Sequence, residues 1–293
     1  MFLPKSDNCS VTSMLAVDDE VVWCGLCDGS ISILASSTAK QVHSIQAGAP
    51  VFCMALVECN KERLVLCSLV DGKILAYSLN FSLQFSDSKR FSPSCFVTCV
   101  LQKGAHLWMG TSKGDVIISS SECAPFEKLG SFDSIHVSFV SSLVAYDNLV
   151  WSGSYDRRII VWNADGDSIT KRTELNGHGS RVNGMVLTDK HVWSFASDKN
   201  LCIWDKKDLR IVKEVISAHS DSVLCGVQCG DRVYTGAASL CKNIRGWIVG
   251  DASSEEGKKK EQQSVENLLT LADMTLGLFS PTVESKNQEN KVF

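Results

Sequence analysis

Two stretches decide the fold: VWSGSYDRRIIVW at residues 150–162 and VWSFASDKNLCIWD at residues 192–205. Each contains a short apolar run, a turn with an aspartate, and a second apolar run that ends in tryptophan, which is typical of two β-strands joined by a tight turn. Trp151 and Trp193 lie 42 positions apart, as do Trp162 and Trp204. The spacing therefore indicates a structural repeat longer than one hairpin.

The same spacing extends through nearly all of the chain in two independent series. One series marks the end of an apolar run after each turn, at Leu34, Tyr77, Ser119, Trp162, Trp204 and Trp247. The residues of the other series come earlier in each unit, at Trp23, Leu66, Trp108, Trp151, Trp193 and Tyr234. A period of 42 to 43 residues built from short strands is typical of the blades of a β-propeller.

We therefore predict an all-β fold, a β-propeller of six four-stranded blades over residues 1–251. The sixth unit ends near Val249 after three strands. Two alternatives follow from this. Residues 1–8 supply the missing fourth strand and close the ring, or a seventh blade is absent from this chain.

The character of the sequence changes after Asp251, so we expect a flexible tail over residues 252–293. The segment DASSEEGKKKEQQ is polar and charged, which favours disorder. Near 262–279 the segment VENLLTLADMTLGLF has an apolar stripe at helical spacing, and Pro281 would end a helix there. This short amphipathic helix either packs on the propeller or docks into a partner.

Composition narrows the class of protein. A net charge of -4 and a pI near 5.9 do not favour nucleic-acid binding, and no apolar stretch is long enough for membrane insertion. Most of the thirteen cysteines lie inside apolar strand runs, and the N-terminus has no secretory signal pattern. We therefore expect reduced thiols and a cytoplasmic location.

Histidine, serine, aspartate and tryptophan recur together at fixed spacing. One set is His136, Ser152, Asp156 and Trp162, and the other is His178, Ser194, Asp198 and Trp204. His, Ser and Asp could form a hydrolase triad, but a triad is needed once, whereas this set repeats. The repetition favours a structural hydrogen-bond chain in each blade.

These residues resemble those of the Trp-Asp (WD) repeat β-propellers. The resemblance rests on NGHGSRV, VWSGSYDRRIIVW and VWSFASDKNLCIWD, and covers roughly residues 11–250. It implies that the two sets above are structural, and that partners contact the loops around one end of the channel. The first three units depart from the pattern, because they lack the leading histidine and end in Leu34, Tyr77 and Ser119.

The predicted function is a non-catalytic scaffold that binds partner proteins or peptides through these loops. Tyr155 and Arg181 are the expected anchors, with Arg157 and Ser197 beside them, because aromatic residues and arginine are enriched at binding hot spots. The arginines favour an acidic or phosphorylated peptide. The domain itself is expected to be monomeric.

Two other functions are alternatives to this scaffold. The resemblance also implies a regulatory C-terminal module of a signalling or vesicle-trafficking protein, such as a small-GTPase exchange factor or a kinase. An enzyme is disfavoured, because the predicted channel strands VTSML, VFCMAL and FVTCVL carry no histidine or carboxylate. No metal site is expected, since Cys24-Gly-Leu-Cys27 has no second pair at a matching distance, and no cofactor is expected either.

Overall fold

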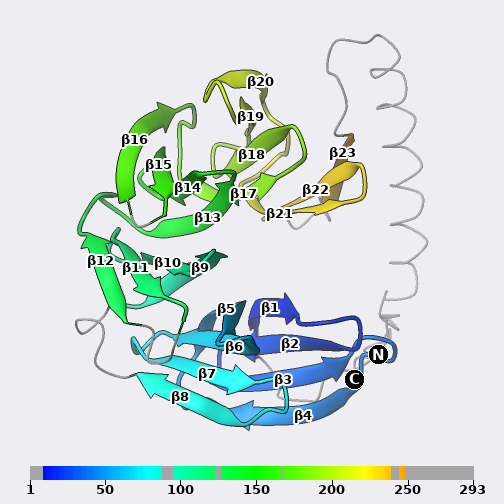
Figure 1. Ribbon diagram of the computed structural model, residues 1–293. Helices are drawn as coiled ribbons and strands as arrows, with labels where there is room; N and C mark the ends of the chain where they lie inside the picture. Colours follow the sequence, from blue (N-terminus) through cyan, green and yellow to red (C-terminus); the bar gives the residue numbers. More distant parts are fainter. Residues whose placement is uncertain (1–8, 88–94, 123–126, 167, 239–243, 249–293) are drawn as a thin grey trace, which may run out of the picture.

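The computed structural model describes residues 9–87, 95–122, 127–166, 168–238 and 244–248. They form an all-β propeller of six blades, which confirms the predicted fold class (Figure 1). Five blades are four-stranded antiparallel sheets, and the sixth has three described strands. The expected tail helix and the expected strand at residues 1–8 lie outside the described residues.

The strands of each blade run in order from the channel outward. The innermost strands are β1 (Val11–Ala16), β5 (Val51–Cys59), β9 (Val97–Lys103), β13 (Val140–Tyr146), β17 (Val182–Leu187) and β21 (Val223–Cys229). The second strands, which carry the leading tryptophan series, are β2 (Val21–Leu26), β6 (Glu62–Leu69), β10 (His106–Thr111), β14 (Leu149–Ser154), β18 (His191–Ala196) and β22 (Arg232–Ala237).

The outer half of each blade follows the same plan. The third strands are β3 (Ser30–Ala35), β7 (Ile74–Ser78), β11 (Val116–Ser120), β15 (Arg158–Asp165), β19 (Leu201–Asp205) and β23 (Ile244–Ile248). The outermost strands are β4 (Gln41–Gln46), β8 (Leu83–Asp87), β12 (Lys128–Phe132), β16 (Ser168–Asn176) and β20 (Ile211–Val215). Both sequence series therefore mark equivalent strands in all six blades.

The hydrophobic core lies between neighbouring blades rather than inside one sheet. In the interface of blades four and five, for example, Trp151 and Val161 pack with Val182 and Met185. Similar clusters join each successive pair from blade one to blade six. The alternation of side chains along each strand explains this arrangement, because both faces of a central blade are buried.

A valine at the start of each innermost strand fits against the second strand of the preceding blade. A Cβ atom on Gly25 would lie 2.7 Å from Val51 Cγ1, and one on Gly110 would lie 2.6 Å from Val140 Cγ1. Glycine at this point therefore leaves space for the first valine of the next blade. The valines that start blades two to six are at most 1% exposed, whereas Val11 in blade one is 39% exposed.

The residue after that valine forms a β-bulge in all six innermost strands. In four blades its side chain donates a hydrogen bond to the valine carbonyl of the next blade. Thr12 and Thr98 donate to Val51 and Val140, and Ser141 donates to Val182 over 2.6 Å. Asn183 donates likewise to the Val223 carbonyl over 2.6 Å. These bonds tie successive blades together around the channel.

Among the described residues, blades six and one are not packed against each other as the other neighbouring blades are. Each innermost strand from β1 to β17 packs against the innermost strand of the next blade, but within the described residues no comparable contact joins β21 to β1 (Figure 1). Val227 and Ile244, on the face of blade six that would meet a following blade, are 60% and 74% exposed. Blade six therefore ends the row of packed blades with an apolar face.

Candidate partner-binding surface

The His–Ser–Asp–Trp set of blade four is a continuous chain of buried hydrogen bonds. Trp162 Nε1 donates to Ser152 Oγ over 3.0 Å, and Ser152 Oγ lies 2.9 Å from His136 Nε2. His136 Nδ1 lies 2.9 Å from Asp156 Oδ2. Because Ser152 accepts from the indole, its own hydroxyl hydrogen can point to Nε2, which leaves Nδ1–H to donate to the carboxylate.

Blade five repeats the chain with the same geometry. Trp204 Nε1 donates to Ser194 Oγ over 2.8 Å, His178 Nε2 lies 2.8 Å from that oxygen, and His178 Nδ1 lies 3.0 Å from Asp198. Both serines are 0% exposed, so no substrate can reach either hydroxyl. These sets therefore connect the strands and loops within one blade, and their serine hydroxyls are not exposed to a substrate.

The carboxylate of Asp156 is strongly stabilised in its ionised form. Burial opposes its ionisation, but hydrogen bonds from His136, from the backbone of Arg158 and from the Arg158 guanidinium hold its pKa well below the usual range. Asp198 has a lowered pKa for similar reasons, with His178 and the backbone of Asn200 as partners. Both side chains lock the turn between the second and third strands.

Blade six has only part of the chain among its described residues. Trp247 Nε1 donates to Thr235 Oγ1 over 2.8 Å, and His219 Nε2 lies 2.7 Å from the same oxygen. His219 Nδ1 is buried and has no hydrogen-bond partner in the described part of the chain. Burial, with a smaller contribution from the charge of Arg245, lowers the pKa of His219 to about 4.

The residues that directly follow the second strand of each blade share one backbone contact. Tyr155 N donates to the Phe139 carbonyl over 2.9 Å, and Ser197 N donates to the Arg181 carbonyl over 2.9 Å. Equivalent bonds occur at Cys27, Val70, Ser112 and Ala238. Their partners come directly before the first valine of each innermost strand. These residues therefore form a rim around the end of the channel where the innermost strands begin.

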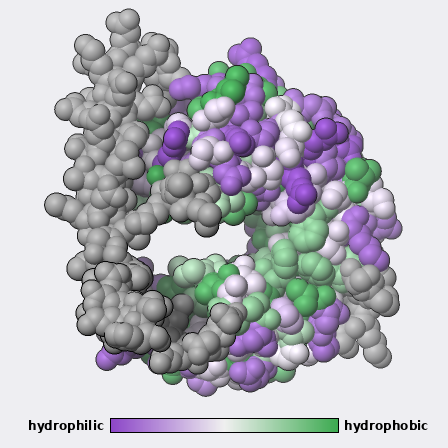
Figure 2. All heavy atoms as spheres, turned by 180° about the vertical axis from the view of Figure 1, so that it is seen from behind, coloured by the Kyte–Doolittle hydropathy of each residue, from purple (hydrophilic) through white to green (hydrophobic). Residues whose placement is uncertain are grey.

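An aromatic cluster lies on this rim and spans three blades. The ring centroids of Phe52 and Phe96 are 4.9 Å apart, and Phe139 lies 5.5 Å from Phe52 and 5.7 Å from Phe96. Phe139 also stacks on Tyr155 at 5.2 Å. All four rings are half-buried. Figure 2 shows the molecule hollowed at its centre, with apolar residues gathered on the side where Figure 1 places β9 and β13.

Arg181 extends the cluster onto blade five. Its guanidinium carbon lies 5.5 Å from the centroid of Tyr155, within the range of a cation–π interaction, and the side chain is exposed. The structure thus brings together Tyr155 and Arg181, the two anchors expected from the sequence. We call Phe52, Phe96, Phe139, Tyr155 and Arg181 the channel-mouth cluster.

The other two expected contact residues lie beside the cluster. Arg157 is exposed in the turn after Asp156, with a positive φ of 78°. Ser197 is half-buried and accepts a hydrogen bond from Asn183 Nδ2 over 3.1 Å. The neighbouring Arg158 is not available in the same way, because its guanidinium forms ion pairs with Asp156 and Glu174. Arg157 and Arg181 are therefore two exposed cations of this region.

Sequence reasoning missed the three phenylalanines. Phe96 and Phe139 occupy the same position before the first valine as Arg181 does, so the register of the repeat could have identified them. Phe52 occupies the bulge position, where four other blades carry a polar side chain. No periodic signal marks it, because it is an exception to the repeat.

No family model and no curated protein sequence matches the chain. Solved structures show the same fold at low identity. The computationally designed Ika8 protein is similar with a TM-score of 0.63 at 23% identity, covering 82% of this chain and 71% of the other. A chain in the crystal structure of the mitotic checkpoint complex is similar with a TM-score of 0.70 at 20% identity, covering 84% and 77%. This chain is a six-bladed β-propeller.

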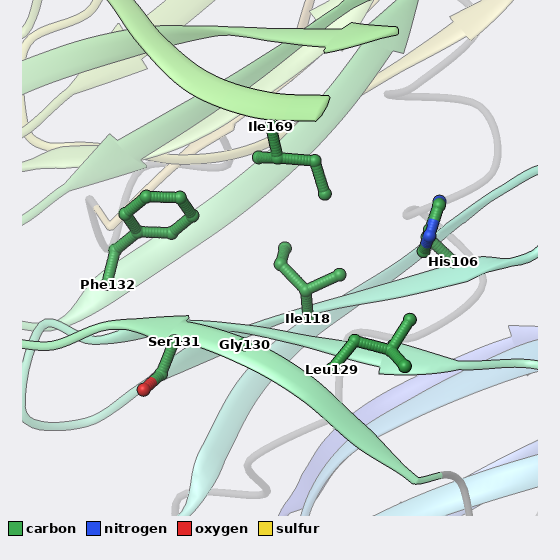
Figure 3. A pocket seen from close by; sticks show the side chains of 7 residues that line it. All are labelled: His106, Ile118, Leu129, Gly130, Ser131, Phe132 and Ile169. Atoms are coloured by element: carbon green, nitrogen blue, oxygen red, sulfur yellow. The ribbon is translucent and has the colours of Figure 1, made fainter. Parts of the chain in front are cut away.

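A second concavity lies on the side of the propeller between blades three and four (Figure 3). Its volume is about 450 Å³, and Ile118, Leu129, Phe132 and Ile169 form most of its lining, with His106 at one end. Ile169 projects from β16 toward Ile118, while Ser131 points away from the space. The pocket offers an apolar surface but few polar groups that would orient a ligand.

Within the described ranges, no group of three or more histidine, cysteine, aspartate or glutamate side chains is placed to hold a metal ion. In the same part of the chain, no helix is long and apolar enough to cross a bilayer.

Proposed function

We propose that this chain is a WD-repeat β-propeller that acts as a non-catalytic scaffold and binds a partner protein or peptide at the channel-mouth cluster. The observation that carries the proposal is that four aromatic rings and an exposed arginine meet on one rim although they come from four blades. Rigid aromatic residues and arginine supply most of the binding energy at protein interfaces.

Phe52 of the cluster replaces a hydrogen bond that recurs in other blades, which supports a role in binding. Phe52 stands where Thr12, Thr98, Ser141 and Asn183 each donate a hydrogen bond to the next blade. A phenylalanine cannot donate this bond, so blade two gives up one tie to blade three. Functional sites commonly carry such locally unfavourable choices.

The partner's chemistry follows from the cluster. Half-buried rings favour an apolar or aromatic anchor, and the exposed guanidinium of Arg181 favours a carboxylate or a phosphate next to it, because arginine binds both in a bidentate manner. We therefore propose a peptide segment with a bulky apolar residue beside an acidic or phosphorylated residue. The buried Ser152 and Ser194 hydroxyls support a role without catalysis.

The test is affinity capture from a cell lysate with the full chain and two variants, Phe52→Thr and Arg181→Glu. We expect both variants to lose partners that the wild-type chain retains, and synthetic peptides from those partners to bind only the wild-type chain. Val212→Thr and Arg172→Glu, on the outer strands β20 and β16, are the matched controls and should retain them. Equal capture by all five proteins would overturn the proposal.

A further inference from the structure

Two cysteine side chains meet at the rim end of blade one. Cys9 lies two residues before β1, and Cys27 directly follows β2. Their Sγ atoms are 3.2 Å apart. Cys27 N donates to the Ser10 carbonyl over 3.0 Å, and Ser10 N lies 3.2 Å from Cys27 Sγ. The sheet itself therefore holds the two thiols in contact.

This pair is more accessible than most cysteines of the molecule. Cys27 is exposed and Cys9 is half-buried. Cys202, by contrast, is buried, and burial raises its pKa to about 12, which suppresses its thiolate. The exposed residues Cys225 and Cys229 lie four positions apart on β21. That spacing is about 13 Å along a strand, which is too far for a disulfide.

We propose that Cys9 and Cys27 are a reversible disulfide site that reacts with small disulfides of the glutathione class. The exposed Cys27 thiolate attacks one sulfur of glutathione disulfide, forms a mixed disulfide and releases one glutathione thiolate. Cys9 then loses its proton and attacks the Cys27 sulfur, which releases the second glutathione. Two protein thiols are thereby oxidised, and one glutathione disulfide is reduced to two glutathiones.

The hydrogen bond with Cys27 raises the pKa of Cys9 above its ordinary value, so Cys9 keeps its proton in the reduced pair. This favours Cys27 as the first thiol to react and Cys9 as the resolving one. The order of reaction matches their exposure.

The position of the site gives the bond a structural consequence. Blade one is the first in the row of described blades, and its innermost strand is largely exposed. A Cys9–Cys27 disulfide would join Cys9, two residues ahead of β1, to the β2–β3 turn and would fix this end of the row. Cys27 is also the rim residue of blade one, so oxidation removes an exposed thiol from the rim that carries the channel-mouth cluster.

The experiment equilibrates the reduced full chain in glutathione buffers of graded oxidation, blocks free thiols, and quantifies cysteine-containing peptides by mass spectrometry. We expect a linked Cys9–Cys27 peptide two hydrogen atoms lighter than the reduced pair. In Cys9→Ser, Cys27 should instead keep a glutathione adduct. Cys225 serves as the internal control for an exposed thiol and should form the adduct in both proteins.

Formation of the linked peptide in the wild-type chain, together with its loss in Cys9→Ser, would support the proposal. The proposal is wrong if Cys27 retains glutathione in the wild-type chain under conditions where Cys225 is modified. It is also wrong if Cys27 stays unmodified there. Circular dichroism of Cys9→Ser verifies that the variant is folded, so a missing link reports on the pair itself.

Discussion

Gly110 of blade three and Val140 of blade four meet so closely that a Cβ atom on the glycine would lie 2.6 Å from Val140 Cγ1 and 2.7 Å from Cys99 Sγ. Real Cβ atoms do not approach other heavy atoms to this distance, so the interface admits only glycine there without a shift. In blade six a Cβ atom on the equivalent Gly236 would meet, among the described residues, only the Cys225 sulfur, at 3.0 Å. The same residue is therefore under different constraints in the two blades.

The first prediction concerns these two glycines. Gly110→Ala should lower the free energy of unfolding by about 1–3 kcal/mol, the usual cost of adding a methyl group to a tightly packed core. Gly236→Ala should change it far less, because the exposed Cys225 side chain can move aside. Denaturant unfolding of both variants checks this, and equal losses would show that blade six is packed as tightly as blade three.

The second prediction concerns the hydrogen-bond chain of blade four. Ser152→Ala should destabilise the protein by about 1–3 kcal/mol, because it leaves the Trp162 and His136 ring nitrogens buried without their common partner. Ser44→Ala, at an exposed position on β4, is the control and should be nearly neutral. Thermal denaturation measures both. A neutral Ser152→Ala would mean that the chain contributes no stability.

The third prediction concerns His219 and pH. The pKa of His219 is about 4 in the folded protein, below the ordinary value of 6.5 that we assign to the unfolded chain. As the pH falls, the unfolded chain therefore takes up the proton first. The stability that depends on neutral His219 is therefore complete above about pH 6.5 and is lost progressively toward pH 4, by about 3 kcal/mol at most. Unfolding free energies measured from pH 4 to 7 should show this loss.

His219→Gln provides the comparison for that experiment. The variant keeps a side chain able to hydrogen-bond Thr235 but has no proton to take up, so its stability should vary less between pH 4 and 6.5. An unchanged pH profile would contradict the assignment to His219. At still lower pH, protonation of Asp156 and Asp198 should destabilise both proteins, because these carboxyls have lowered pKa values.

The fourth prediction concerns the stability of Phe52→Thr. A threonine at the bulge can donate to the Val97 carbonyl as Thr12 and Thr98 do in their blades, which contributes about 0.5–1.5 kcal/mol. Loss of the ring contacts with Phe96 and Phe139 opposes this gain. We therefore expect unfolding free energy within about 1 kcal/mol of wild type, measured by denaturant titration. A much larger loss would assign Phe52 a role in folding.

The features that recur from blade to blade could be predicted from the sequence, whereas contacts that occur in a single blade could not. The period of Trp151 and Trp193 located the second strands, because side chains at equivalent points of each blade face the same kind of interface. Tyr155 was expected on the rim from its position before Asp156, and Arg181 from its position shortly after His178. Phe52 and the Cys9–Cys27 contact depend on how particular strand ends meet, and no period encodes such a contact.

Among the described residues, the interfaces between the six blades form a linear row rather than a closed ring. In a closed ring every blade is held by two neighbours, whereas here the described residues hold blades one and six by one interface each. Stability in such arrays is approximately a sum over nearest-neighbour terms, so the terminal units open first. Amide exchange should accordingly be fastest in β1 and β21 and slowest in β9 and β13, and local unfolding should travel inward from the two ends toward the rim that carries Phe96 and Phe139.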